Sequence, residues 1–187
     1  MSLSKIKPEQ GTILISEPFL KDSYFNRSVV LLAEHNENGT FGLIINKPIE
    51  IKLNEVLKDF PYFETNLFIG GPLKTDNLFM LHTLGEQVEN SSKIMHGLSW
   101  GGNIDTIKSM IEDKKITPDN IRFFIGYSGW EANQLDRELT ENSWIVTKAK
   151  PNELMIKSPE ILWKKIVTSL GSEYAMWANY PLDPLMN

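Results

Sequence analysis

Apolar residues occur along the chain in short unbroken runs that are separated by turn residues. The runs 12–16 (TILIS), 28–34 (SVVLLAE) and 40–46 (TFGLIIN) are rich in valine, leucine and isoleucine. Unbroken runs of this length are typical of strands that are covered on both faces. The same pattern along the chain predicts strands at 12–16, 28–34, 40–46, 67–69, 78–84, 94–99, 121–125 and 144–146.

Turn residues mark the ends of the second and third strands. Residues 35–39 (HNENG) contain an Asn-Gly pair, which is a strong local signal for a hairpin. The strands at 28–34 and 40–46 should therefore pair with each other. Lys47-Pro48 should end the strand at 40–46, because proline has no N–H to donate to a neighbouring strand.

Helical spacing alternates with these strands. Leu53, Val56, Leu57 and Phe60 recur at i, i+3, i+4 and i+7, which is typical of an amphipathic helix. Similar spacing predicts further helices over 104–111, 132–139 and 159–170. Strands come in groups before and between the helices, so the predicted class is α+β.

Length and composition favour one domain. A protein of 187 residues can bury a sizeable core by itself, so we expect a single domain over 1–187. Residues 172–187 are rich in aromatic residues, and we expect them to form an extended segment packed on the body as a C-terminal extension. There is no cysteine, which excludes disulfides and thiolate metal sites.

The charge distribution argues against a nucleic-acid binder. The formal net charge is -5 with a pI near 5.3, and lysines occur only as scattered short pairs such as Lys114-Lys115. A nucleic-acid-binding surface normally shows a basic stripe. No run reaches the roughly 18 apolar residues of a membrane span, and the N-terminus lacks the apolar core of a signal peptide. We therefore expect a cytoplasmic protein.

The stretch 126–130 (GYSGW) is the first candidate for chemistry. A strand, a tight turn with Ser128 and a following helix would be the setting of a nucleophile elbow. The elbow pattern fails, because the second glycine is one place early and His35, His82 and His96 all precede the serine. Triad orders of other folds remain open. The favoured interpretation is that the glycines turn the backbone and that Tyr127 and Trp130 anchor the core.

Histidines and other glycines give weaker signals. His82 lies within an apolar strand, where a hydrogen-bonded core histidine is expected, whereas His35 closes a strand and is better placed for function. No histidine spacing indicates a metal site. Gly70-Gly71-Pro72 lacks the pattern of a phosphate-binding loop. The glycines at 101–102 precede a helix that could hold an anion, although a flexible turn is favoured.

Four longer segments carry a resemblance to a known family. They are GTILISEPFLKDSYFNRSVVLLAEHNENGTFGLIINKP, IGGPLKTDNLFMLH, IRFFIGYSGWEANQLDRELTENSWI and ILWKKIVTSLG. Together they resemble the YqgE/AlgH family of bacterial proteins, from Gly11 to about Gly171. The resemblance implies one compact α+β domain with a branched, mostly antiparallel sheet folded into a partial barrel and helices packed outside. Family members are mostly uncharacterised, and many are labelled transcriptional regulators.

The family's recurring positions fall mainly at the ends of predicted strands. In this sequence they are Glu34, His35, Asn36, Asn46, Pro48, Gly70, Gly71, Pro72, Leu81, His82, Gly126, Tyr127, Gly129, Trp130, Gln134 and Leu135. One departure is Glu131-Ala132-Asn133, where the family usually has a Gly-Pro-Gly-like run. We expect this change to weaken any glycine-built site and to favour a helix from residue 131. The family supplies no catalytic residues to carry over.

The function expected from these features is binding or regulation through an unknown small molecule or protein partner. We expect no cofactor, no metal, no membrane and no direct contact with nucleic acid; the sequence leaves the oligomeric state open. The alternative is an enzyme of unknown reaction with a polar site near Asn46 and the turns at 70–72 and 126–130. The candidate ligand-binding residues are His35, Asn46, Lys47, Gly70, Gly71, Tyr127, Ser128 and Gln134.

The hairpin predicts where these candidates can lie. His35 and Asn36 belong to its turn, whereas Asn46 closes its second strand, roughly 20 Å away at about 3.3 Å per residue. We therefore expect two separate polar sites, one at each end of the hairpin. The His35 end should be mainly turn chemistry, and the Asn46 end is the preferred candidate for function. One of the two glycine turns should approach Asn46.

Overall fold

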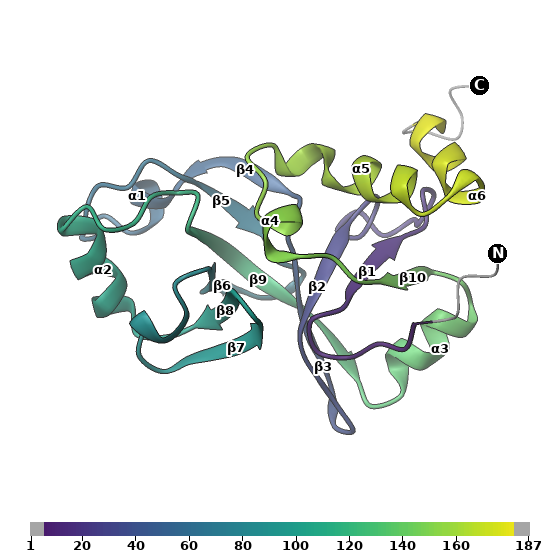
Figure 1. The fold of residues 1–187 in the computed structure, drawn as a ribbon, viewed down its shortest axis with the longest axis horizontal. Helices are drawn as coiled ribbons and strands as arrows, with labels where there is room; N and C mark the ends of the chain where they lie inside the picture. The colour runs from purple at the N-terminus through teal and green to yellow at the C-terminus, as the bar shows by residue number, and fades with distance from the viewer. Residues whose placement is uncertain (1–5, 182–187) are drawn as a thin grey trace.

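The computed structural model describes residues 6–181, which form one α+β unit with a ten-stranded branched sheet (Figure 1). Residues 1–5 of the N-terminal segment and residues 182–187 of the expected C-terminal extension lie outside the described residues. The strands are β1 (Ile13–Ser16), β2 (Val29–Asn36), β3 (Gly39–Ile44), β4 (Pro48–Lys52), β5 (Asn66–Ile69), β6 (Leu73–His82), β7 (Ser91–Met95), β8 (Leu98–Gly101), β9 (Ile121–Glu131) and β10 (Trp144–Thr147). The predicted fold class is confirmed.

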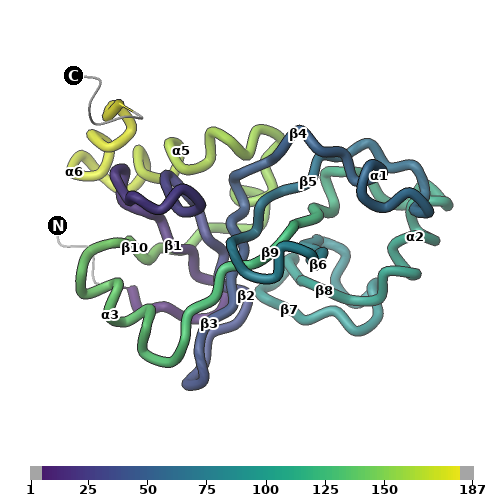
Figure 2. Tube along the Cα trace, turned by 180° about the vertical axis from the view of Figure 1, so that it is seen from behind, coloured from purple at the N-terminus to yellow at the C-terminus, as the bar shows by residue number. Residues whose placement is uncertain are grey.

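Six α-helices and three short 3₁₀ helices accompany the sheet in the described residues. The α-helices are α1 (Leu53–Val56), α2 (Ile104–Glu112), α3 (Gln134–Thr140), α4 (Pro151–Leu154), α5 (Leu162–Ser169) and α6 (Ser172–Ala175). The 3₁₀ helices are η1 (Gly85–Gln87), η2 (Pro159–Ile161) and η3 (Met176–Asn179). Figures 1 and 2 show α1 and α2 at one end of the molecule and α3 with β10 at the other.

The predicted hairpin of β2 and β3 is present. The two strands pair antiparallel from Val30 opposite Ile44 to Asn36 opposite Gly39, with one irregularity after Leu32. All five residues of 29–33 are buried, as expected for a strand covered on both faces. The hairpin therefore fixes the turn at 36–39 at one end and Asn46 at the other.

Strand β9 is the centre of the sheet and corrects the interpretation of 126–130 as a turn. It runs without interruption through eleven residues to Glu131, so the expected strand–turn–helix arrangement around Ser128 is wrong. Its second half is held by β3, with Thr40 opposite Trp130 and Gly42 opposite Ser128. Gly126 takes a positive φ of 70°, a local distortion that the strand accommodates. The glycines therefore lie within a long strand, and residues 126–130 do not form a nucleophile elbow.

Three partners make β9 the branch point. It pairs antiparallel with β3 and β6 and parallel with β5, and β5 pairs in turn with β4. The main path of the sheet runs β10-β1-β2-β3-β9-β6-β8-β7. The branched and mostly antiparallel sheet that the resemblance implied is thus confirmed.

The sheet curls so that its distant strands approach each other, but it does not close into a barrel. The side-chain amide of Gln10 donates to the carbonyl oxygens of Ala33 in β2 and Lys93 in β7, both at 3.0 Å. A shared core includes β2 residues and Ile94 and Leu98 of the β7–β8 hairpin. The Gln10 side chain, rather than hydrogen bonds between paired strands, therefore connects β2 with β7.

Several element boundaries differ from the predictions. The single strand expected at 94–99 is the β7–β8 hairpin, and β6 begins five residues before the predicted start at residue 78. The segment 172–179 is helical rather than extended, although Trp177 packs on the core as expected. Apolar runs locate buried segments, but polar strand ends and short terminal helices depend on contacts with the rest of the fold.

Candidate functional site at the hairpin end of the sheet

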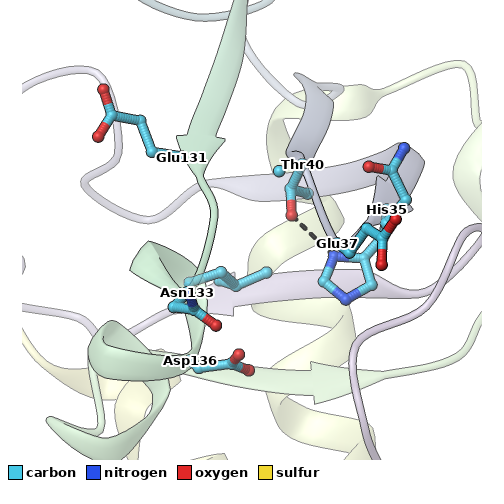
Figure 3. A pocket seen from close by; sticks show the side chains of 9 residues that line it. His35, Glu37, Thr40, Glu131, Asn133 and Asp136 are labelled. Carbon is cyan, nitrogen blue, oxygen red and sulfur yellow. Dashed lines mark hydrogen bonds between the residues drawn. The ribbon is translucent and has the colours of Figure 1, made fainter.

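A polar depression lies where the β2–β3 turn meets the end of β9 and the start of α3 (Figure 3). Its volume is about 180 Å³. It is lined by His35, Asn36, Glu37, Gly39, Thr40, Glu131, Asn133, Leu135 and Asp136, which we call the hairpin-end depression. Two segments that are distant in sequence meet here, because β3 pairs with β9.

His35 and Thr40 form the centre of one wall. They are cross-strand partners in the β2–β3 hairpin, and His35 Nδ1 lies 2.7 Å from Thr40 Oγ1. Thr40 is buried at 8% exposure, whereas His35 is half-buried. Asn36 Oδ1 accepts from the Asn38 N–H at 2.9 Å, which confirms the expected turn chemistry at Asn36. The imidazole is therefore held in place by a buried hydroxyl.

Asn133 shapes the opposite wall. It has a φ of 62°, in the left-handed region that asparagine tolerates better than most residues. It occupies the segment where the resembling family usually has glycines. The expected helix from residue 131 is wrong, because β9 continues to Glu131 and α3 begins at Gln134. A residue with positive φ is still required here, and asparagine adds a polar side chain to the depression.

The rim of the depression is acidic. Glu37, Glu131 and Asp136 are exposed residues that line it. Figure 3 shows the Glu37 carboxylate beside the half-buried His35 and the Asp136 carboxylate directed toward it, whereas the Glu131 side chain points away. Among residues 6–181, no three histidine, aspartate or glutamate side chains are grouped closely enough to hold a metal ion. Carboxylate and amide oxygens accept hydrogen bonds, so the arrangement is suited to a ligand group that donates hydrogen bonds and carries positive charge.

The Asn46 end of the hairpin has a different character. Asn46 is 5% exposed; its Oδ1 accepts from the Val29 N–H at 2.8 Å, and its Nδ2 donates to the Arg27 carbonyl at 3.0 Å. The Lys47 ammonium donates to the carbonyl oxygens of Ser23 and Tyr24, at 3.3 and 2.6 Å. These side chains fasten the loop before β2 to the end of β3.

A second depression, of about 200 Å³, borders Lys47. It is lined by Ser23, Tyr24, Lys47 and Ile69. Burial lowers the pKa of Lys47 below its usual value, and the charge of Asp22 opposes this shift. The ammonium already donates to two carbonyls, so little of its hydrogen-bonding capacity is left for a ligand.

The two glycine segments cross in the middle of the fold. A Cβ on Gly70 would lie 2.2 Å from the Gly126 oxygen, and one on Gly71 would lie 2.2 Å from the Tyr127 carbonyl carbon. Ser128 is fully buried, and its hydroxyl donates to the Gly70 carbonyl at 3.0 Å. Glycine is therefore required so that the two backbones can approach. The Ile69 N–H donates to Lys47 O at 3.0 Å, so the residue that precedes the 70–72 turn lies beside the Asn46 end, while the glycines themselves lie in the crossing.

Tyr127 and Gln134 are held by their neighbours. The Tyr127 ring lies 4.9 Å from Phe41 and 5.6 Å from Phe79 between ring centroids, within an aromatic cluster. Gln134 Oε1 accepts from the Glu131 N–H, and its Nε2 donates to Glu138 Oε1. Gln134 thus fixes the backbone beside the hairpin-end depression without lining it.

The eight candidate residues fall into three places. His35 and Gln134 lie at the hairpin end, Asn46 and Lys47 at the opposite end, and Gly70, Gly71, Tyr127 and Ser128 in the crossing between them. His82 is a fully buried, hydrogen-bonded core residue, as predicted.

Sequence reasoning did not identify several residues of the depression. Thr40, Glu131, Asn133 and Asp136 were not among the candidates, although all four line it. The departure at 131–133 from the family's glycine run points to Asn133. A residue that replaces glycine can keep its positive φ and adds a side chain at that place. Nothing in the local sequence brings Asp136 into the same depression as His35; that proximity depends on the pairing of β3 with β9.

Comparisons with known proteins place this fold among bacterial relatives. A UPF0301 protein of Cytophaga hutchinsonii is 44% identical over 179 residues, covering 95% of this chain and 98% of the relative. A UPF0301 protein of Bacteroides fragilis is 46% identical over 185 residues, covering 98% and 94%.

Two solved structures share the architecture. The solution structure of the AlgH protein from Pseudomonas aeruginosa is 28% identical with a TM-score of 0.73, covering 94% of this chain and 98% of that chain. The crystal structure of a Corynebacterium diphtheriae protein has a TM-score of 0.80 at 22% identity, covering 95% of both chains, and shows the fold alone.

The family pattern described as AlgH-like matches residues 13–175, which include both strands of the hairpin, β9 and the hairpin-end depression. With relatives above 40% identity over nearly the whole sequence, this match agrees with the resemblance seen in the sequence. The chain belongs to the AlgH-like family.

Proposed function

We propose that this protein is a cytoplasmic binding or regulatory protein that recognises a partner at the hairpin-end depression. The observation that carries the proposal is the acidic, oxygen-rich rim, on which the carboxylates of Glu37 and Asp136 lie on the side of His35 and Glu131 adds a third negative charge to the lining. Such a rim favours a cationic donor, such as a lysine or arginine side chain of a protein or a small polyamine. The absence of cysteine fits a reducing compartment.

The same rim argues for regulation without direct DNA contact. The protein has a formal net charge of -5, and phosphate neutralisation requires clustered lysine and arginine. A role in transcription, which the regulator label of the resembling family suggests, would act through a protein or small-molecule partner. None of the helices within residues 6–181 is long and apolar enough to cross a membrane.

The geometry of His35 and Thr40 favours a second candidate, an enzyme. An imidazole 2.7 Å from a hydroxyl is within the range of a base that activates a nucleophile. Thr40 is only 8% exposed, however, which limits its access to a substrate. The polar atoms of Asn46 and Lys47 are occupied by backbone groups, so an enzyme site there has less to support it.

The experiment that tests the binding proposal is a thermal-shift screen sorted by ligand charge. Spermidine, short lysine- and arginine-containing peptides and inorganic phosphate would be compared, because a ligand that binds only the native state raises its melting temperature. We expect a rise with at least one cationic probe and none with phosphate. The double variant Glu131→Gln/Asp136→Asn should lose the rise.

Glu112→Gln is the matched control, since Glu112 is exposed on α2 at the far end of the molecule. It removes one carboxylate without changing the depression, so its response should equal that of the parent. An equal rise in the double variant, or a rise with phosphate alone, would contradict the proposal.

A further inference from the structure

The tip of the β2–β3 hairpin carries the one Asn-Gly junction of the sequence, Asn38-Gly39. Asn38 is exposed, and its backbone N–H donates to the Asn36 side chain at 2.9 Å. An Asn-Gly pair favours a hairpin turn. It also has a chemical consequence, because a glycine after asparagine leaves the following backbone nitrogen unhindered.

The fold requires this glycine. Gly39 has a φ of 144°, a conformation that residues with a side chain rarely adopt. A Cβ at this position would lie 2.5 Å from the Trp130 oxygen in β9. Gly39 pairs with Glu131, so its neighbour across the sheet belongs to the hairpin-end depression. Substitution of Gly39 would therefore disturb the pairing of β3 and β9.

We propose that Asn38 is a site of spontaneous deamidation. The Gly39 nitrogen attacks the amide carbon of the Asn38 side chain, and the new bond between these two atoms closes a five-membered succinimide. The bond from that carbon to the original amide nitrogen breaks. The amide nitrogen leaves as ammonia after taking up the proton released by the attacking N–H. A water molecule then opens the ring and yields aspartate or isoaspartate.

The product adds a negative charge at the edge of the hairpin-end depression. Asn38 follows Glu37, which lines the depression together with Gly39. A carboxylate there strengthens an already acidic rim, and an isoaspartate also lengthens the backbone of the turn. If the proposed binding of a cationic partner is right, this conversion changes the affinity; the deamidation itself does not depend on that function.

The test follows the amide in the intact full-length protein. Native protein and protein unfolded in urea would be incubated at mildly alkaline pH, digested and analysed by peptide mass mapping with chromatographic separation of aspartate and isoaspartate. In the native sample we expect loss of the amide at Asn38 before the other asparagines, and a more acidic species on ion exchange. Asn38→Gln, which keeps an amide but disfavours ring closure, should lose that species.

The comparison asparagines are Asn133 and Asn142, which also lie in turns but precede glutamine and serine. If Asn38 keeps its amide in the native protein while the unfolded protein loses it, the turn protects the junction and the proposal is wrong. Earlier conversion at Asn133 or Asn142 would overturn it as well. Asn38→Asp then isolates the effect of charge: an unchanged response to cationic probes would contradict only the link to binding.

Discussion

At the scale of single residues, the carboxylate of Glu138 is shared between elements rather than left to a ligand. Glu138 Oε2 accepts from the indole N–H groups of Trp130 and Trp144, both at 2.8 Å. Phe25 packs on both rings, at centroid distances of 6.0 and 5.4 Å. One carboxylate on α3 thereby joins β9 and β10, and the Phe25 ring adds the loop before β2, which makes the tryptophans structural.

Trp130 tests this conclusion. Its ring is 5% exposed in a cluster with Leu14 and Ile44, so Trp130→Ala should lower the free energy of unfolding by about 3–5 kcal/mol. Trp130→Phe keeps most of the ring and loses the bond to Glu138, so its loss should be smaller. Urea unfolding followed by circular dichroism measures both. Should the alanine variant unfold like the parent, the ring does not contribute to the core.

His82 predicts a pH dependence of stability. Burial lowers its pKa below the ordinary 6.5, although the hydrogen bond to Gly101 O opposes the shift. Nε2 lies 3.2 Å from Gly101 O and Nδ1 accepts from the Leu84 N–H at 3.4 Å, which fits a neutral ring protonated on Nε2. Below about pH 6.5 the unfolded protein binds a proton that the native state resists.

The contribution of His82 to the free energy of unfolding should therefore be fully present above about pH 6.5. The free energy of unfolding should fall as the pH drops below about 6.5. Urea unfolding of the parent and of His82→Gln across this range measures the effect, since glutamine does not titrate. The variant should show a shallower decline than the parent. Equal slopes would mean that His82 titrates alike in both states.

At the scale of elements, pairing across the sheet overrides local patterns. The apolar runs predicted β1, β2, β3 and the first half of β9, because burial on both faces is visible in sequence. The second half of β9 could not be predicted, because glycine and serine at 126–129 favour turns locally, and they are held extended by β3 and by the pairing of Tyr127 with Leu73 of β6. His35 lies near the end of β2, as expected for its place in the sequence, but Glu131 and Asp136 join it in lining the depression only through that same pairing.

Arg122 shows how one side chain fastens an element to the sheet. It is 5% exposed, and its guanidinium donates to the carbonyl oxygens of Ile45, Leu154 and Ile156. It also lies over the Phe68 ring at 5.0 Å. Burial lowers its pKa to about 10. The guanidinium thus connects β9 with the end of the β2–β3 hairpin and with α4.

Removal of the Arg122 guanidinium should lower the free energy of unfolding. Arg122→Met leaves the buried carbonyls of Ile45 and Leu154 and the partly buried carbonyl of Ile156 without their donor. At roughly 1–3 kcal/mol for each buried unsatisfied group, we expect a loss of at least about 2 kcal/mol. Arg122→Lys keeps the charge but lacks the planar fork, and should recover only part of the loss. Chemical denaturation gives the values. A methionine variant within about 0.5 kcal/mol of the parent, the range of ordinary surface substitutions, would show that the guanidinium is not the fastening group.

At the scale of the whole molecule, the charge decides which partners are possible. The formal net charge of -5 is combined with a carboxylate rim at the hairpin-end depression. A duplex carries two phosphates per base pair, and sequence-independent affinity requires lysine and arginine to neutralise them. The scattered lysines of this protein provide no such stripe. Long-range repulsion therefore opposes any approach of DNA to the acidic end of the sheet.

We therefore predict no specific binding to duplex DNA at physiological salt. Fluorescence anisotropy or an electrophoretic shift assay at about 150 mM salt should show no complex below the micromolar range, whereas specific DNA-binding proteins typically reach about 10⁻⁸ M or tighter. Lowering the salt should yield at most weak binding that is equal for unrelated sequences, because only phosphate contacts would contribute. The variant Glu131→Gln/Asp136→Asn separates two causes of weak DNA binding, which are the missing basic surface and the repulsion by the acidic rim. If the variant stays as weak as the parent, the missing basic surface is the reason; if it gains affinity, rim repulsion contributes. Submicromolar, sequence-dependent binding by the parent protein would instead show that a basic surface forms where the charge pattern predicts none.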